Sequence, residues 1–277
     1  MQTKVFNVHD PRFKEIPTLE NTLKALFFVS SVFALVFLAD ATGKYFDSIQ
    51  NIAGAPKFFL KWTLLLTIGF WINFLFMAMA ILIHEAAHKM FAKTRWVNEL
   101  AGNLMGFPIF LPFNSYRNAH FVHHRILRDK GNDPEAGFHL EKSTFERLIV
   151  GALRNSSVLT RNAKNLFLNK SAPKKERRLA LLDLGSRLAA TIFWYFFISK
   201  CGLSFLYVLV PFFGMSGLVY SLRGTLDHHG LPAAKKVNDR CILVHEKLCY
   251  ITHTNRAMEI VWSNVNYHTV HHMYPQV

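Results

Sequence analysis

The sequence predicts an all-α integral membrane protein with four transmembrane helices in two hairpins and a cytoplasmic helical cap. Three observations support this fold class. Half of the 277 residues are hydrophobic and 26 are phenylalanine, more than a soluble core of this size needs. One apolar stretch carries no charge, and another is too long for a single crossing of a bilayer. Eight histidines form three clusters that this topology would place on one side of the membrane.

The first two spans follow a polar segment, 1–22, which is expected to be soluble and leaves 23–277 as one membrane domain. The apolar run 25–39 ends without a small-residue cleavage site, so it is predicted to be a retained span rather than a signal peptide. It is shorter than the ~20 residues that a span needs, so Lys24 is expected to extend its side chain to the interface. The strongest span is 62–83, which contains no charged residue.

The lengths of the next two apolar segments do not match a single crossing of a bilayer. Residues 105–113 contain two prolines and are too few to cross a bilayer, so they are expected to dip into the membrane or lie at its interface. Residues 188–222 are apolar except for Lys200, and as one helix they would measure about 52 Å against a ~30 Å bilayer core. Two spans that meet near Lys200 resolve this excess. Asp183 and Arg187, four residues apart, can pair where the first of them begins.

The basic residues predict the orientation. The linker 161–178 carries seven Lys or Arg directly before the third span, whereas the loop 40–57 carries two. By the positive-inside rule the linker is cytoplasmic, and both termini and the histidine clusters lie on that side. The bacterial inner membrane is the favoured location and the endoplasmic reticulum the alternative. The formal charge of +14 does not imply a nucleic-acid partner, because no nucleic-acid-binding motif is present.

The three histidine clusters predict a site for two metals. The clusters are HEAAH with His84 and His88, HFVHH with His120, His123 and His124, and HTVHH with His268, His271 and His272. On a helix, residues i and i+4 lie about 40° apart, so each cluster occupies one face. Eight imidazoles exceed the three or four ligands of one zinc. Imidazole suits iron among other metals, and two nitrogen-ligated irons with open positions could activate O₂ for attack on lipid C–H bonds.

Further residues are expected around the metals. Asp227, His228 and His229 follow the fourth span directly, and one of the two histidines is expected to be a ninth ligand. We favour His228, with Asp227 as the hydrogen-bond acceptor that fixes its tautomer. Glu85 and Asp133 are candidates for the same role behind other ligands. No catalytic residue beyond the metal ligands is predicted.

The motifs resemble a known superfamily. HEAAHKMF at 84–91, HFVHHR at 120–125 and HTVHHMYP at 268–275 resemble the three histidine boxes of membrane fatty-acid desaturases and hydroxylases. GNDPEAG at 131–137 adds to the resemblance, because an Asp-Pro often follows the second box in this superfamily. The resemblance implies two non-haem irons, O₂ as co-substrate, a lipid or acyl substrate and two electrons from an external donor. Desaturation is the favoured reaction. RGTLDHHG at 223–230 is similar to a motif of alkane hydroxylases and carotenoid oxygenases, so hydroxylation, carotenoid ketolation or hydroxylation, and decarboxylation remain alternatives.

The electrons are expected to come from another protein. The chain has no GxGxxG, no CxxC among its three cysteines and no haem motif, so no built-in relay is recognisable. Its basic cytoplasmic face would attract a small acidic carrier of the ferredoxin or cytochrome b5 type, or else only anionic membrane lipid. The chain stops at Val277, five residues after the last box histidine, and its C-terminus is expected to be truncated.

The histidine clusters admit two other classes of function. HEAAH matches the HExxH motif, in which His84 and His88 would bind zinc, Glu85 would act as base and Asp133 could be a third ligand of an intramembrane protease. This hypothesis leaves six clustered histidines unexplained. A non-catalytic metal carrier would need a path across the membrane, and histidines on one face only argue against it. The metal content separates the classes, since the oxidoreductase needs two irons and the protease one zinc.

Overall fold

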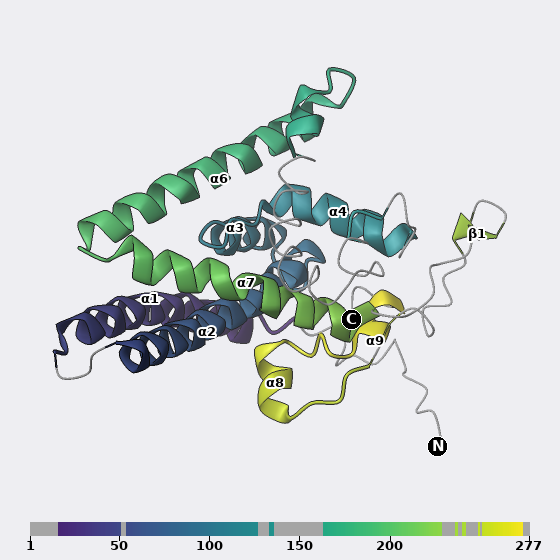
Figure 1. Cartoon of the computed structure of the whole chain (residues 1–277). Helices are drawn as coiled ribbons and strands as arrows, with labels where there is room; N and C mark the ends of the chain where they lie inside the picture. Colours follow the sequence, from purple (N-terminus) through teal and green to yellow (C-terminus); the bar gives the residue numbers. More distant parts are fainter. Residues whose placement is uncertain are drawn as a thin grey trace.

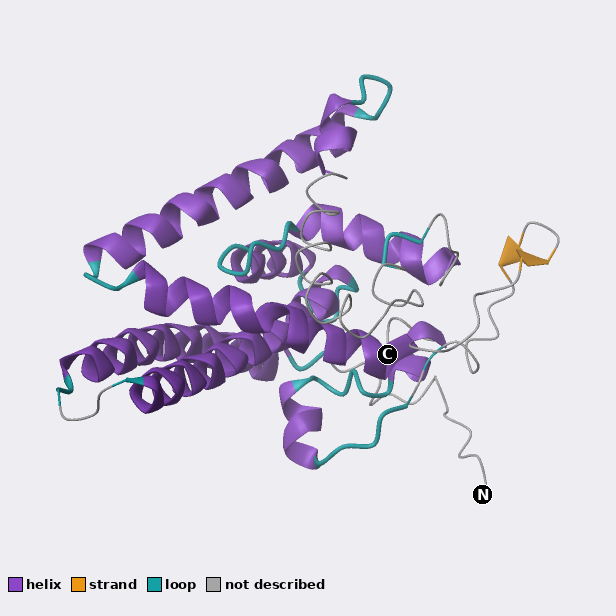
Figure 2. Cartoon of the chain, in the orientation of Figure 1, coloured by secondary structure: helices purple, strands orange, loops and turns teal. Residues whose placement is uncertain are grey.

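The structure is a computed structural model, and the chain is helical, as predicted. It describes residues 16–50, 54–126, 133–135, 163–228, 236–237, 240–241, 249 and 251–273. Within these residues, extended structure is limited to one antiparallel pair of very short strands, β1 (Lys236–Val237) and β2 (Arg240–Cys241). Helices make up almost all the rest (Figure 2).

The helices are arranged around one central member. In chain order they are α1 (Thr18–Ser48), α2 (Ala55–Ala87), α3 (Arg95–Gly106), α4 (Phe113–Ile126), α6 (Lys174–Lys200), α7 (Phe205–His228), α8 (Arg256–Val261) and α9 (His268–Met273). Helix α2 packs against α1, α3 and α7. Helix α6 packs mainly against α4 and runs along the edge of the molecule opposite α1 (Figure 1).

Three described helices, α1, α2 and α6, are long and apolar enough to cross a membrane. Helix α7 has a shorter apolar stretch, Phe205–Val219, so the fourth span remains a prediction. Large apolar side chains such as Phe27, Phe59 and Leu188 are exposed on these helices, as expected of surfaces that face lipid. The third and fourth predicted spans are separate helices here, because α6 ends at Lys200 and α7 begins at Phe205.

Helix α1 is longer than the apolar run 25–39 that predicted it. It begins at Thr18, inside the segment expected to be soluble, and residues 1–15 lie outside the described part of the chain. The polar ends stay helical because they contain ion pairs at i, i+4 spacing: Lys24 with Glu20 and Lys44 with Asp40, each at 2.7 Å. Lys24 therefore pairs along its own helix.

Helices α2 and α7 approach each other closely at Gly69. A Cβ atom at Gly69 would lie 2.3 Å from the carbonyl oxygen of Pro211, inside van der Waals contact. One turn further along α2, the buried Asn73 Nδ2 donates to the carbonyl oxygens of Gly69 and Phe212, each at 2.8 Å. A small residue and a hydrogen bond between helices are typical of packing between membrane spans.

The segment 105–113 does not form a helix of its own. Helix α3 ends at Gly106, residues 107–110 form turns, residues 111–112 are irregular, and α4 begins at Phe113. Helix α6 covers this link, because Trp194 Nε1 donates to the carbonyl oxygen of Pro108 at 2.9 Å. Helix α3 is amphipathic, with Trp96, Leu100 and Leu104 exposed along one side.

Candidate metal centre

The first histidine cluster closes helix α2. His84 lies in its last turn and His88 follows as the residue that caps its C-terminus. The chain then turns at Lys89, whose φ is +63°. Asn98 holds this turn, since its side chain accepts from the backbone N–H groups of Phe91 and Ala92, each at 3.1 Å. The position of His88 is therefore tied to the start of α3.

The second cluster, His120, His123 and His124, lies on the last two turns of α4, where His120 and His124 face the end of α2. The start of α4 is held by Asp183 of α6, whose carboxylate accepts hydrogen bonds from Asn114 and Ser115. Helical spacing predicts that Asp183 can pair with Arg187 on its own helix, but it does not predict these bonds to α4.

The third cluster lies on the short helix α9. The chain reaches it from α8 through a tight turn in which Ser263 and Asn264 have positive φ angles of 47° and 59°. The start of α9 is anchored by Thr269, whose Oγ1 donates to the carbonyl oxygen of Cys249 at 3.0 Å. This arrangement places His271 directly against His84 and His124.

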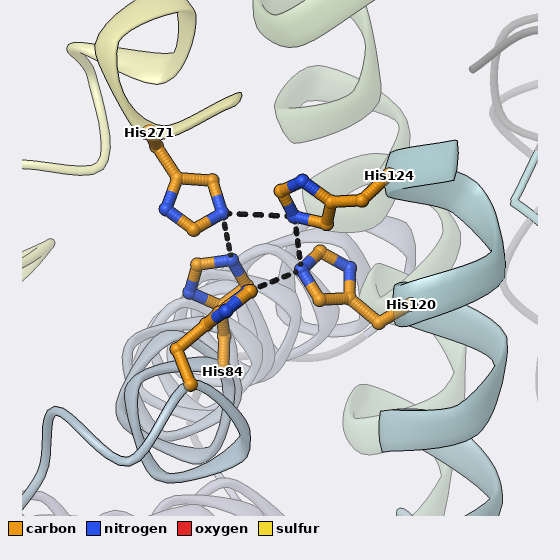
Figure 3. A group of neighbouring side chains, drawn as sticks. His84, His120, His124 and His271 are labelled. Carbon is orange, nitrogen blue, oxygen red and sulfur yellow. Dashed lines mark hydrogen bonds between the residues drawn. The ribbon is translucent and has the colours of Figure 1, made fainter. Parts of the chain in front are cut away.

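Five histidines from the three clusters form one compact group. They are His84, His88, His120, His124 and His271, and one ring nitrogen of each lies within 4.8 Å of those of all the others. Their Nε2 atoms meet in a chain of contacts, His88–His120 at 3.0 Å, His120–His124 at 2.9 Å, His124–His271 at 3.1 Å and His271–His84 at 2.9 Å. In Figure 3 the labelled rings of His84, His120, His124 and His271, from α2, α4 and α9, turn towards a common centre.

Carboxylates fix the tautomers of three box histidines. Glu85 Oε1 lies 3.1 Å from His84 Nδ1, and Glu135 Oε1 lies 3.1 Å from His120 Nδ1. Asp133 Oδ2 lies 2.9 Å from His123 Nδ1. A carboxylate at Nδ1 keeps the proton there and leaves a lone pair on Nε2.

The Nε2 contacts therefore fit a cation better than hydrogen bonds. Each Nε2 has either one proton or one lone pair, yet those of His120, His124 and His271 each have two partners. Nitrogens bound to one metal at ~2.1 Å, at right angles to each other, would be about 3.0 Å apart. The observed contacts match that spacing, so the donor set fits a bound metal.

Burial keeps three of these imidazoles, those of His88, His124 and His271, neutral, as metal ligands must be. It lowers the pKa of His88 to about 3 and that of His124 to about 2, and the neighbouring His120 adds to both shifts. Burial also lowers the pKa of His271 well below its usual value. Burial alone would raise the pKa of the Glu135 carboxyl, but the neighbouring His123 and His120 outweigh this effect and hold that pKa at about 2.

The remaining three box histidines lie beside this group. His268 and His272 have Nε2 atoms 3.1 Å apart, and the ring of His123 lies 5.2 Å from that of His272. The ring of His272 stacks on His124 at 4.3 Å, so the two groups share a boundary. All eight box histidines are thus brought together by the fold.

The predicted ninth ligand lies outside what the structure describes. His228 is the last residue of α7, but its side chain and that of Asp227 are not described, nor is His229. Glu135 was missed by the sequence analysis. The available signal was its position two residues after Asp133 within the GNDPEAG motif.

Comparison with known proteins identifies the family. The family model for fatty acid desaturases matches residues 57–277, which include all three clusters. The chain belongs to the fatty acid desaturase family. Together with the three apolar helices, membership indicates an integral membrane protein.

Individual desaturases resemble the chain over parts of their length. The sn-1 oleoyl-lipid 12-desaturase of Synechocystis is 26% identical over 78% of this chain and 65% of its own. The sn-1 acyl-lipid omega-3 desaturase (ferredoxin) of Nostoc is 27% identical over 56% of this chain and 40% of its own. The chloroplastic omega-6 fatty acid desaturase of Spinacia oleracea is 25% identical over 84% of this chain and 54% of its own. The chain thus spans less than two thirds of each of these relatives.

Proposed function

We propose that the protein is a membrane di-iron oxidoreductase that desaturates the acyl chains of lipids with O₂ and electrons from an external donor. The observation that carries this proposal is the set of five Nε2 atoms that converge at the spacing of metal ligands. Membership of the fatty acid desaturase family supports the reaction type.

The two groups of histidines would hold one metal each. His84, His88, His120, His124 and His271 would bind the first. His123, His268 and His272 would bind the second, together with His228 or His229 from the end of α7. Two irons bound there would supply the reduction of O₂ and the removal of hydrogen from an unactivated C–H bond.

The protein side chains would hold and orient the metals. The carboxylates of Glu85, Glu135 and Asp133 keep the Nδ1 protons of His84, His120 and His123 in place, so that Nε2 is free to bind. Burial lowers the pKa values of His88 and His124 and so keeps these two ligands unprotonated near neutral pH. A buried site suits a reaction on an apolar chain.

The substrate and donor are inferred from the relatives. Several relatives carry acyl-lipid desaturase names, so a membrane-lipid acyl chain is the favoured substrate. The Nostoc relative carries ferredoxin in its name, which supports a small acidic donor, with cytochrome b5 as the alternative. Arg125, exposed on the helix that carries the second cluster, would contribute to a basic docking face for it.

The favoured topology has four spans and a cytoplasmic centre. Asn21, near the start of α1, donates to the carbonyl oxygen of Phe91 at 3.1 Å, so the N-terminal end of α1 lies at the histidine end of α2. The linker 161–178 supplies the positive charge expected on the cytoplasmic side. The bacterial inner membrane remains the favoured location.

Lipid analysis of a host that expresses the full-length protein tests the reaction. We expect a new acyl species with one more double bond, which disappears in a His124→Ala variant and persists in a Glu20→Gln variant, changed at an exposed ion pair. A hydroxylated product would favour the hydroxylase alternative. An unchanged lipid profile with folded, iron-loaded protein and a supplied donor would contradict the proposal.

A further inference from the structure

Asp183 is a buried carboxylate on a helix that otherwise exposes most of its apolar side chains. The residues of α6 that are buried lie on one face: Ala180, Asp183, Ala190, Trp194 and Ile198. Only 1% of Asp183 is exposed. A charged group buried to this extent is costly unless its oxygens are fully hydrogen-bonded.

In the described part of the chain, the start of α4 donates four hydrogen bonds to the Asp183 carboxylate. Oδ1 accepts from the backbone N–H of Asn114 at 3.2 Å and from its Nδ2 at 3.0 Å. Oδ2 accepts from the backbone N–H of Ser115 at 2.7 Å and from its Oγ at 2.6 Å. The first-turn N–H groups of a helix lack partners within that helix and carry the positive end of its dipole. Asp183 therefore caps α4 from a different helix.

The link before α4 is held by the same helix. Trp194 of α6 donates to the carbonyl oxygen of Pro108 at 2.9 Å, so α6 binds both ends of the segment 108–115. On the other side, Arg117 of α4 forms an ion pair with Glu99 of α3. The start of α4 is thus fixed between α3 and α6, and Asp183 is its buried charged attachment.

The distance from this attachment to the histidines makes its position important. Ser115 and His124 are nine residues apart, or about 13 Å along a helix. A rotation of about 10° at the start of α4 would move His124 by about 2 Å. Metal sites require ligand distances to within about 0.2 Å, so such a rotation would break the coordination.

We propose that Asp183 is a positioning residue, which sets where α4 presents His120, His123 and His124 to the metals. This inference rests on the proposed metal centre. Asp183 acts through α4 and makes no contact of its own with the metals. The favourable bonds that it makes to the helix N-terminus are lost or weakened if the carboxylate loses its charge.

The test is Asp183→Asn in the full-length protein, with iron affinity measured by competition with a chelator and the site followed by Mössbauer spectroscopy. The amide would point an NH₂ group at N–H and O–H donors that need an acceptor. We expect iron binding about 10-fold weaker, the lower end of the range for residues that support metal ligands, and an altered spectrum.

The matched control is Asp40→Asn. Asp40 is also buried, and its Oδ1 accepts from the backbone N–H of Ser204 just before α7, at the end of the bundle away from the histidines. This change should lower the melting temperature but leave iron affinity and spectrum as in the wild type. Combining Asp183→Asn with Asn114→Asp returns a carboxylate to the same pair and should restore part of the iron affinity.

The outcomes separate the two proposals. A wild type that binds no iron overturns the proposed function itself. If the wild type binds iron and Asp183→Asn has the same iron affinity and spectrum as the wild type or as Asp40→Asn, the positioning role alone is overturned. If Asp183→Asn does not fold, Ser115→Ala removes a single bond of the four, and a measurable loss of iron affinity supports the role while no loss contradicts it.

Discussion

At the scale of single residues, three carboxylates decide what the histidines can bind. Glu85, Glu135 and Asp133 each contact the Nδ1 atom of a box histidine and so direct its Nε2 lone pair inward. Glu135 has a second neighbour, since its Oε2 lies 3.9 Å from His123 Nε2. It therefore lies between a histidine of the five-member group and one of the adjoining group.

We predict that Glu135→Gln weakens metal binding without unfolding the protein. The amide is a poorer acceptor for the Nδ1 proton of His120 than the carboxylate, and residues in this role typically contribute 10- to 100-fold to metal affinity. Iron retained against a chelator series measures the effect. Glu20→Gln, at an exposed ion pair, is the control and should match the wild type. Equal affinity in all three proteins would show that Glu135 does not orient a ligand.

The buried imidazoles also predict a pH dependence for the metal-free protein. An unfolded histidine takes up a proton near pH 6.5, whereas burial first and then His120 hold the pKa of His88 near 3 in the folded state. Between these values the unfolded state binds more protons, so stability falls as pH falls, by up to about 1.4 kcal/mol per pH unit for each such histidine. Melting of chelated protein at pH 7.5 and 5.5 checks the direction, and His88→Asn should make the dependence shallower. A stability that rose towards pH 5.5 would contradict it.

At the scale of helices, the close approach of α2 and α7 supports the site, because α2 carries the first cluster. We predict that Gly69→Ala forces these helices apart, since its Cβ would lie 2.3 Å from a backbone oxygen of Pro211 that cannot move independently. A loss of about 1–3 kcal/mol is expected, as for other overpacked positions. Gly185→Ala is the control, because its Cβ would meet nothing within 4 Å and helix propensity favours alanine. Thermal unfolding in detergent should separate the two variants, and equal melting temperatures would refute the prediction.

The helices also show where sequence patterns stop being informative. Hydropathy found the apolar middle of α1 but not its ends, because polar residues there stay helical through ion pairs such as Lys44 with Asp40. Spacing predicts that Asp183 can pair with Arg187, but it does not predict that the Asp183 carboxylate bonds to α4, 68 and 69 residues away in sequence. Helical spacing identifies residues on one face, but it carries no information about which other helix that face meets.

At the scale of the whole molecule, the sequence predicted the eight box histidines as one set, and the fold brings them together. Spacing sufficed for this because His84 and His88, like His120 and His124, must share a helix face. Spacing could not divide the eight histidines into two groups, because that division depends on how α9 packs against α4. His271 contacts His84 and His124, whereas His272 lies against His123.

The predicted orientation can be tested across the whole chain. A reporter fused after Lys170, in the basic linker, should be cytoplasmic, and one inserted near Ile49, between α1 and α2, should be external. The glycosylation sequons at Asn155 and Asn169 should stay unmodified. The reverse pattern of reporter activity would place the histidines on the external face and contradict the proposed topology.

The most direct test of the central claim is the metal content of the purified full-length protein, expressed with both iron and zinc available. Elemental analysis should give two irons per chain and no stoichiometric zinc, because the eight box histidines exceed the ligands of one metal. His271→Ala should lose iron, since it removes the ligand that α9 contributes to the five-member group. One zinc per chain, unaffected by His271→Ala, would contradict the di-iron account and favour a hydrolase built on HEAAH.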